Sequence, residues 1–278
     1  MIAAIAAPAA VAGAGSVHPG VQTFTNGGQC TANFVFSNGS STYIGQAAHC
    51  AGLGGATETD GCSTQSLPIG TEVSIDGATK PGTLAYSSWR TMQAVGETDA
   101  AACAFNDFAL VKVDPSDVAS VDPSVPRFGG PTGVGEADTG ATILAYGNSS
   151  LRLGIAQLSP KEGLVLLVDG GGWSRNVLTV TPGVPGDSGS GYMNERGEAV
   201  GVLSTLALLP LPLSNGVGDL SLELDYMRSH SSLTGVRLVE GTKPFKGDLL
   251  AAIVGRSITD GLSGSGLRDG LRGLFGGR

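Results

Sequence analysis

Pro185-Gly186-Asp187-Ser188-Gly189-Ser190-Gly191 is the stretch of this 278-residue sequence that says most about its fold. A nucleophilic serine needs a tight turn that exposes its Oγ and directs backbone N–H groups toward a developing oxyanion. The glycines in this stretch permit such a turn because they carry no Cβ. In a chain with 45 glycines the same residues could also form an ordinary surface turn, so the rest of the sequence must decide.

A histidine that could serve such a serine lies upstream, in Gln46-Ala47-Ala48-His49-Cys50. An isolated histidine is more often structural than catalytic. Here Cys50 can fix the loop through a disulfide, and the small alanines leave room for a side chain in a crowded cleft. His49 is therefore a candidate general base.

An acid lies between these two segments. Asp107 directly precedes the apolar stretch 108–113, which reads as a strand with a buried start. A carboxylate at that point can be shielded from water and can hold an imidazole in one tautomer. Asp99 and Asp114 are the competing acids, and many such aspartates are simply turn residues.

The three segments occur in the order His49, Asp107, Ser188, with separations of 58 and 81 residues. AAHC (47–50), NDFALVKV (106–113) and GDSGS (186–190) resemble the signature segments of the chymotrypsin-like (trypsin-fold) serine proteases, here a bacterial, secreted type. The resemblance covers roughly residues 17–230 and is strong only in these segments. It implies two perpendicular six-stranded β-barrels, a C-terminal helix, and a catalytic site in the cleft between the barrels.

The resemblance also implies roles for individual residues. His49 would be the general base and then the general acid, Asp107 would orient it, and Ser188 would form the acyl-enzyme. The backbone amides of Gly186 and Ser188 would form the oxyanion hole. Asp187 would need a buried cationic partner, for which Arg152 and Arg127 are the candidates.

The expected substrate pocket departs from well-known members of the family. Pro182 stands where trypsin-like enzymes carry an Asp, which disfavours cleavage after Arg or Lys. The opposite wall aligns with Leu203-Ser204-Thr205-Leu206, and Leu206 would narrow or fill the pocket. Leu203 stands where glutamate-specific relatives use a His. By elimination, we expect a small or medium apolar residue before the cleaved bond.

Four cysteines, Cys30, Cys50, Cys62 and Cys103, allow three disulfide connectivities, and the residues alone do not choose among them. The resemblance implies Cys30–Cys50, which leaves Cys62–Cys103. Two disulfides suit an oxidising compartment. Residues 1–16 read as a signal-like leader, although no Lys or Arg precedes Lys80, and we expect a secreted protein.

Turn signals and short apolar runs predict strands around 34–36, 42–45, 73–75, 108–113, 142–146, 164–168, 177–181 and 199–203. Residues 115–135 have a Pro/Gly linker composition. We therefore expect a barrel over 17–125, a second barrel with a helix over 126–232, and a Gly-rich, partly disordered extension over 233–278. Val217, Leu220, Leu224 and Met227 recur at helical spacing, and Asn215 or Asp219 could begin that helix.

The net charge of −8 and the absence of a basic run disfavour nucleic-acid binding, and no apolar run is long enough for a membrane span. The sequence predicts no cofactor, no metal site, a protein or peptide substrate, and a monomer. Two other functions compete with the protease. An α/β-hydrolase is disfavoured because its nucleophile precedes its acid and histidine. An inactive homologue that acts as a secreted binding module is the main alternative.

Overall fold

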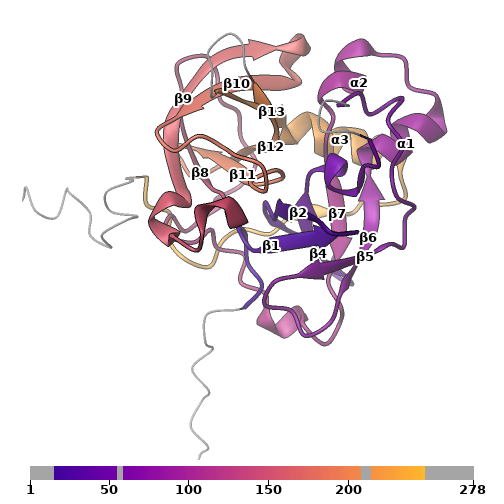
Figure 1. The fold of residues 1–278 in the computed structure, drawn as a ribbon, viewed down its shortest axis with the longest axis horizontal. Coiled ribbons are helices and arrows are strands. Elements are labelled where there is room, and N and C mark those ends of the chain that lie inside the picture. Colours follow the sequence, from indigo (N-terminus) through magenta and orange to yellow (C-terminus); the bar gives the residue numbers. More distant parts are fainter. Residues whose placement is uncertain (1–15, 55–58, 208–213, 248–278) are drawn as a thin grey trace, which may run out of the picture.

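The structure is a computed structural model that describes residues 16–54, 59–207 and 214–247. It contains two strand-rich halves that lie side by side, with the N-terminal half in indigo to magenta and the C-terminal half in red to orange (Figure 1). Nearly all of the expected leader, residues 1–15, lies outside the described part of the chain.

The first half is built on one eight-stranded sheet, in the order β14-β3-β4-β7-β6-β5-β1-β2. Every neighbouring pair in this sheet is antiparallel. Its strands are β1 (Gln22–Thr25), β2 (Gly28–Thr31), β3 (Val35–Ser37), β4 (Thr42–Gln46), β5 (Glu72–Ile75), β6 (Gly82–Ser87), β7 (Ala109–Lys112) and β14 (Arg237–Leu238).

This sheet has two more strands than the six expected. One edge is extended by β14, which comes from the far end of the chain and pairs Arg237 with Ser37. At the other edge, β2 folds back on β1 through the turn at Asn26 and Gly27, both of which have positive φ. Part of the expected C-terminal extension is therefore an edge of the first sheet.

The second half is a closed six-stranded barrel in the order β10-β13-β12-β11-β8-β9, as expected. Its alternating residues bury an apolar interior that includes Ile143, Val165, Val177 and Tyr192. The strands are β8 (Thr142–Tyr146), β9 (Pro160–Asp169), β10 (Ser174–Thr179), β11 (Gly191–Asn194), β12 (Ala199–Ala207) and β13 (Ser214–Asp219).

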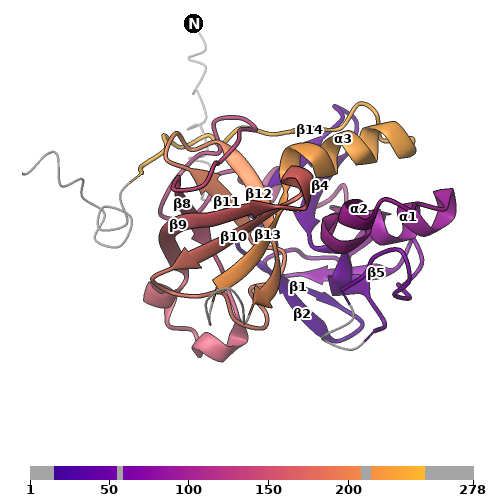
Figure 2. The ribbon, with the colours of Figure 1, turned by 90° about the horizontal axis from the view of Figure 1, so that it is seen from above.

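The predicted C-terminal helix is α3 (Leu220–His230), and Asp219 caps it by accepting from Leu222 N. Val217 of the expected helix instead belongs to β13. Two further helices, α1 (Ser88–Val95) and α2 (Ala100–Phe105), lie between β6 and β7 and were not predicted. Figure 2 shows α3 near the boundary of the two halves, where it contacts α1 of the first half and β12 of the second.

The largest apolar cluster joins the two halves. Phe36 and Phe108 of the first half pack in the same cluster as Leu144 and Met193 of the second, and Leu224 of α3 completes it. Because this shared core fixes one half against the other, loops at their junction can hold side chains from both in a defined geometry. All three predicted signature segments lie at this junction.

Candidate active site

His49 lies in the short 3₁₀ turn η1 (Ala48–Ala51), directly after β4. The disulfide between Cys50 and Cys30 ties this turn to β2. Ala48 and Ala51 are buried, whereas the His49 side chain is 26% exposed. The backbone is therefore anchored while the imidazole remains open to solvent on one side.

The Asp107 carboxylate faces His49 and is almost fully buried. Its Oδ2 lies 2.6 Å from His49 Nδ1, and its Oδ1 accepts a hydrogen bond of 2.8 Å from the His49 amide. Ser204 Oγ donates to the same Oδ2 at 2.5 Å. Three donors thus fix the carboxylate and, through it, the orientation of the imidazole.

The carboxylate also controls the protonation of His49. Burial alone would lower the pKa of His49, but the negative charge of Asp107 and its hydrogen bond outweigh burial. The pKa of His49 is therefore raised above 6.5. A histidine can both take up and release a proton during a reaction, and the Asp107 carboxylate favours the protonated form of His49.

Ser188 follows a turn that the sequence Val184-Pro185-Gly186-Asp187 builds. Asp187 N donates to Val184 O at 2.9 Å, and Gly186 has a φ of +94°. Pro at the second position and Gly at the third are the residues that a type II turn requires. Within the described residues, the amides of Gly186 and Ser188 donate no hydrogen bond, whereas those of Asp187 and Gly189 do.

Close backbone contacts bring the Ser188 turn to the segment that carries His49. Thr31 N donates to Ser188 O at 2.8 Å. A Cβ on Gly189 would lie 2.8 Å from Ala47 N and 2.7 Å from Thr31 O, so only glycine fits there without displacement. The first and second halves therefore meet at the residues next to His49 and Ser188.

Asp187 has two cationic partners, the half-buried Arg152 and the fully buried Lys161. Arg152 lies 2.5 Å and Lys161 lies 3.0 Å from Asp187 Oδ2. Burial would raise the pKa of Asp187, but the Arg152 hydrogen bond and the Lys161 charge lower it below 3.8. Burial also lowers the pKa of Lys161 to about 8.

Of the two candidates from the sequence, Arg152 is the observed partner of Asp187; Arg127 forms no ion pair within the described part of the chain. Lys161 was missed, although a lysine just after Pro160 and shortly before the apolar run 164–168 was a usable signal. Buried lysines are rare unless they are paired.

The walls of the expected substrate pocket are partly described. Pro182 O accepts hydrogen bonds from both Arg152 and Lys161. The Ser204 side chain binds Asp107 rather than facing a pocket. The side chain of Leu206 lies outside the described part, although its backbone pairs with Asn215.

Asn215 joins the two walls; the sequence named it only as a possible start of the C-terminal helix, whereas it lies in β13. Its Oδ1 accepts from Gly183 N at 2.8 Å, and its Nδ2 donates to Gly183 O and Thr205 O, both at 3.3 Å. The buried side-chain amide of Asn215 thus links residue 183 on one wall of the expected pocket to residue 205 on the other.

Two groups of possible metal ligands occur among the described residues. One contains Cys30, His49 and Cys50, and the other contains Asp60, Cys62 and Cys103. Both cysteine pairs are disulfides, so neither group can offer a thiolate. In addition, no helix within the described ranges is long and apolar enough to cross a membrane.

Comparisons with protein-family models and with curated proteins found no match. Solved structures do match. Protease A of Thermobifida fusca aligns with a TM-score of 0.52 and 19% identity, over 81% of this chain and 99% of that one. This chain has the chymotrypsin-like fold.

Two further structures agree with the chymotrypsin-like fold. Cellulomonas bogoriensis chymotrypsin aligns with a TM-score of 0.50 and 16% identity, over 80% of this chain and 98% of that one. A Glu endopeptidase aligns with a TM-score of 0.50 and 18% identity, over 79% and 91%. The all-β class, the closed six-stranded barrel and the C-terminal helix expected from the sequence are thereby confirmed.

Proposed function

We propose that this chain is a serine endopeptidase in which Ser188 is the nucleophile, His49 is the general base and Asp107 orients the imidazole. The observation that carries the proposal is the fixed His49–Asp107 pair, at 2.6 Å, beside a turn whose Gly186 and Ser188 amides have no acceptor among the described residues. The chymotrypsin-like fold of the two halves is consistent with this assignment.

The chemistry proceeds in two balanced steps. Ser188 Oγ attacks the peptide carbonyl carbon while its proton passes to His49 Nε2, and the amides of Gly186 and Ser188 stabilise the oxyanion. The C–N bond then breaks as His49 returns the proton to the leaving amine, which leaves an acyl-enzyme. Water attacks the ester carbonyl while His49 takes its proton, and His49 then returns that proton to Ser188 Oγ as the C–O bond to the acyl group breaks.

Two features support a preference for a small or medium apolar residue before the cleaved bond. The cations nearest the pocket wall, Arg152 and Lys161, are already paired with Asp187 and bound to Pro182 O. Asn215 holds residues 183 and 205 together, which limits the width available between the walls. Among the described residues of these walls, neither a basic nor an acidic side chain of a substrate gains a free counter-charge.

The two disulfides support function in an oxidising compartment, so we place the protein outside the cytosol as a secreted bacterial enzyme. The monomer expected from the sequence is part of the same proposal. The expected partner is a protein or peptide substrate. Residues 1–16, the proposed leader, would be removed on export.

Cleavage of an unfolded protein substrate tests the proposal. New termini, mapped by mass spectrometry, should follow small or medium apolar residues and should disappear with Ser188→Ala. Cleavage that persists in Ser188→Ala would contradict the assignment of the nucleophile. Cleavage mainly after Arg, Lys or Glu would contradict the specificity alone, and no cleavage by folded, oxidised protein would favour a binding module.

A further inference from the structure

Glu223 is a fully buried acid directly behind Asp107. It lies in the first turn of α3, and its Oε1 accepts a hydrogen bond of 3.3 Å from the Asp107 amide. A Cβ on Gly218 would collide with this oxygen, so the glycine makes room for the carboxyl group. The last strand of the barrel and the C-terminal helix thus place a second carboxyl group beside the His49–Asp107 pair.

The two carboxyl groups have very different surroundings. Asp107 receives three hydrogen bonds through its carboxylate oxygens, two of them from His49. Glu223 receives one long bond, and its Oε2 is buried without a hydrogen-bond partner among the described residues. A buried carboxylate without donors or a cation is costly, so the proton resides on Glu223 and the charge on Asp107.

The charged and titratable groups around Glu223 also favour its protonated form. Asp107 faces it from the segment before β7, and Asp219 faces it from the start of α3. Tyr86 of β6 is a further titratable neighbour, itself buried. The nearby cation, Arg175, is paired with Asp219. Burial, and then the charge of Asp107, raise the pKa of Glu223 well above 4.5.

We propose that Glu223 is a positioning residue, a neutral carboxylic acid whose carbonyl oxygen holds the Asp107 amide while Asp107 remains the single negative charge beside His49. This role rests on the proposed function of His49 and Asp107, but it can be tested without any turnover. An ionised Glu223 would add a second negative charge and raise the pKa of His49 further; a missing Glu223 would leave the Asp107 amide unsatisfied.

The test is an NMR titration of the His49 ring in the Ser188→Ala background, which cannot digest itself. Glu223→Gln keeps an acceptor at the same place and adds no charge, so the pKa of His49 should match that of the parent. Glu223→Ala removes the acceptor, so the Asp107 contact should loosen and the pKa of His49 should fall by about one unit. Gly218→Ala, which displaces Oε1, should act in the same direction.

Leu224→Ala is the matched control, because Leu224 is the next residue of α3 and is buried in the shared core. It should lower the melting temperature without moving the His49 titration. A purely structural Glu223 would behave like this control, with no change in His49 for Glu223→Ala.

An ionised Glu223 would give a lower pKa of His49 in Glu223→Gln as well, and that result would also overturn the proposal. If Glu223→Ala does not fold, infrared detection of a carboxylic-acid carbonyl at pH 7 decides. The band should be present in Ser188→Ala and absent from its Glu223→Gln variant. If the protein with Ser188 cleaves no peptide while the His49 titrations behave as expected, the proposed function is overturned. The role of Glu223 in positioning Asp107 is still supported in that case.

Discussion

At the scale of single residues, the pH dependence of cleavage follows from His49. The base must be neutral to accept the Ser188 proton, and its pKa lies above 6.5 because Asp107 outweighs burial. We therefore expect kcat/KM to rise with pH through an apparent pKa above 6.5. A profile that is flat between pH 5 and 8 would contradict the role of His49.

Replacing the carboxylate should reverse this shift. Asp107→Asn removes the negative charge and turns one of the two acceptor oxygens into a donor, so burial would then lower the pKa of His49. We expect kcat to fall by about 10⁴-fold, as when an amide holds the wrong tautomer. Measuring kcat/KM across pH checks both effects. A variant with parental kcat would show that Asp107 does not act on His49.

Glu223 gives a stability prediction at the same scale. Because its folded pKa is raised, its contribution to stability is present below the unfolded value and is lost as pH rises toward the folded value. Glu223→Gln has no such loss. The free energy of unfolding of Glu223→Gln, relative to that of the parent, should therefore increase by about 1.4 kcal/mol per pH unit in that window. Urea unfolding at pH 4 and pH 7 measures this difference. A gap that does not change with pH would contradict a neutral, buried Glu223.

Residue identity alone predicted the segments that meet in the site but not all of their partners. His49, Asp107 and Ser188 stand in recognisable local sequences, and Arg152 was one of two candidates for Asp187. Lys161, Asn215 and Glu223 come from strands and a helix far away in the chain. Their contacts depend on how the barrel closes, which a local pattern does not encode.

At the scale of elements, the glycine at 189 permits the contact between the Ser188 turn and the His49 segment. Gly189 has a φ of +86°, and a Cβ there would lie within 2.8 Å of two backbone atoms, whereas Gly39 has a φ of +87° and open space around it. Both alanine variants bear the cost of positive φ, about 1 kcal/mol. In Gly189→Ala, but not in Gly39→Ala, the added methyl group also pushes the Ser188 turn away from the segment that carries His49.

We therefore expect Gly189→Ala to lose peptide cleavage by about 100-fold or more, on the order of 3 kcal/mol, while Gly39→Ala retains it. Steady-state kinetics and the melting temperatures of both variants check this. Equal losses in the two variants would show that the contact at Gly189 does not position Ser188.

Strand prediction succeeded for clear apolar runs, such as the one that forms β7, and missed β1 and β2 although they form a local hairpin. The strands expected around 34–36 and 42–45 are β3 and β4, which pair with each other, and β8 matches its expected bounds. The short helices α1 and α2 were missed although Ser87 and Asp99 cap them, because each has too few turns for a clear period. β14 has only two residues, too few for a recognisable pattern, and it is a strand only because it pairs with β3.

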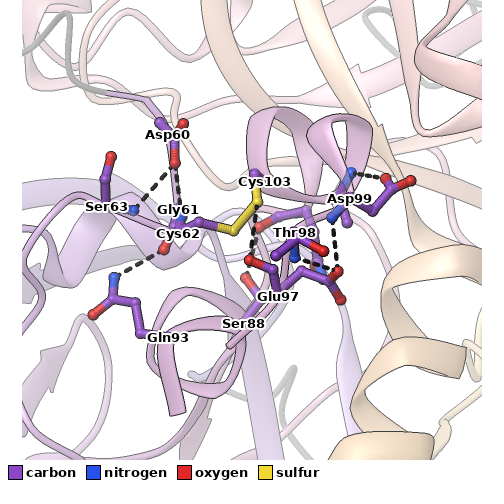
Figure 3. The surroundings of a disulfide bond; sticks show 12 residues. Asp60, Gly61, Cys62, Ser63, Ser88, Gln93, Glu97, Thr98, Asp99 and Cys103 are labelled. Atoms are coloured by element: carbon purple, nitrogen blue, oxygen red, sulfur yellow. Dashed lines mark hydrogen bonds between the residues drawn. A yellow bond between two sulfur atoms is a disulfide. The ribbon is translucent and has the colours of Figure 1, made fainter. Parts of the chain in front are cut away.

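At the scale of the whole molecule, two disulfides secure the first half around the site. Cys62 and Cys103 are 41 residues apart, and their bond joins the loop after His49 to α2, four residues before Asp107 (Figure 3). Gly61 N also donates to Cys103 O, and Gln93 binds Gly61 O, so the loop is held by hydrogen bonds as well.

Removing this disulfide should destabilise the folded protein mainly by increasing the conformational entropy of the unfolded chain. With Cys62→Ser and Cys103→Ser together, we expect a loss of about 4 kcal/mol, from the entropy of closing a loop of that length. Urea unfolding of oxidised parent and variant measures it. An unchanged free energy of unfolding would mean that the hydrogen bonds around Gly61 hold the loop without the disulfide.

The central claim is that the two halves assemble a reactive Ser188, and labelling with a fluorophosphonate probe tests it most directly. The folded, oxidised protein should be labelled once, at Ser188, more slowly as pH falls through the pKa of His49, and Ser188→Ala should not be labelled. Absence of labelling in the folded protein, or equal labelling of Ser188→Ala, would contradict the account.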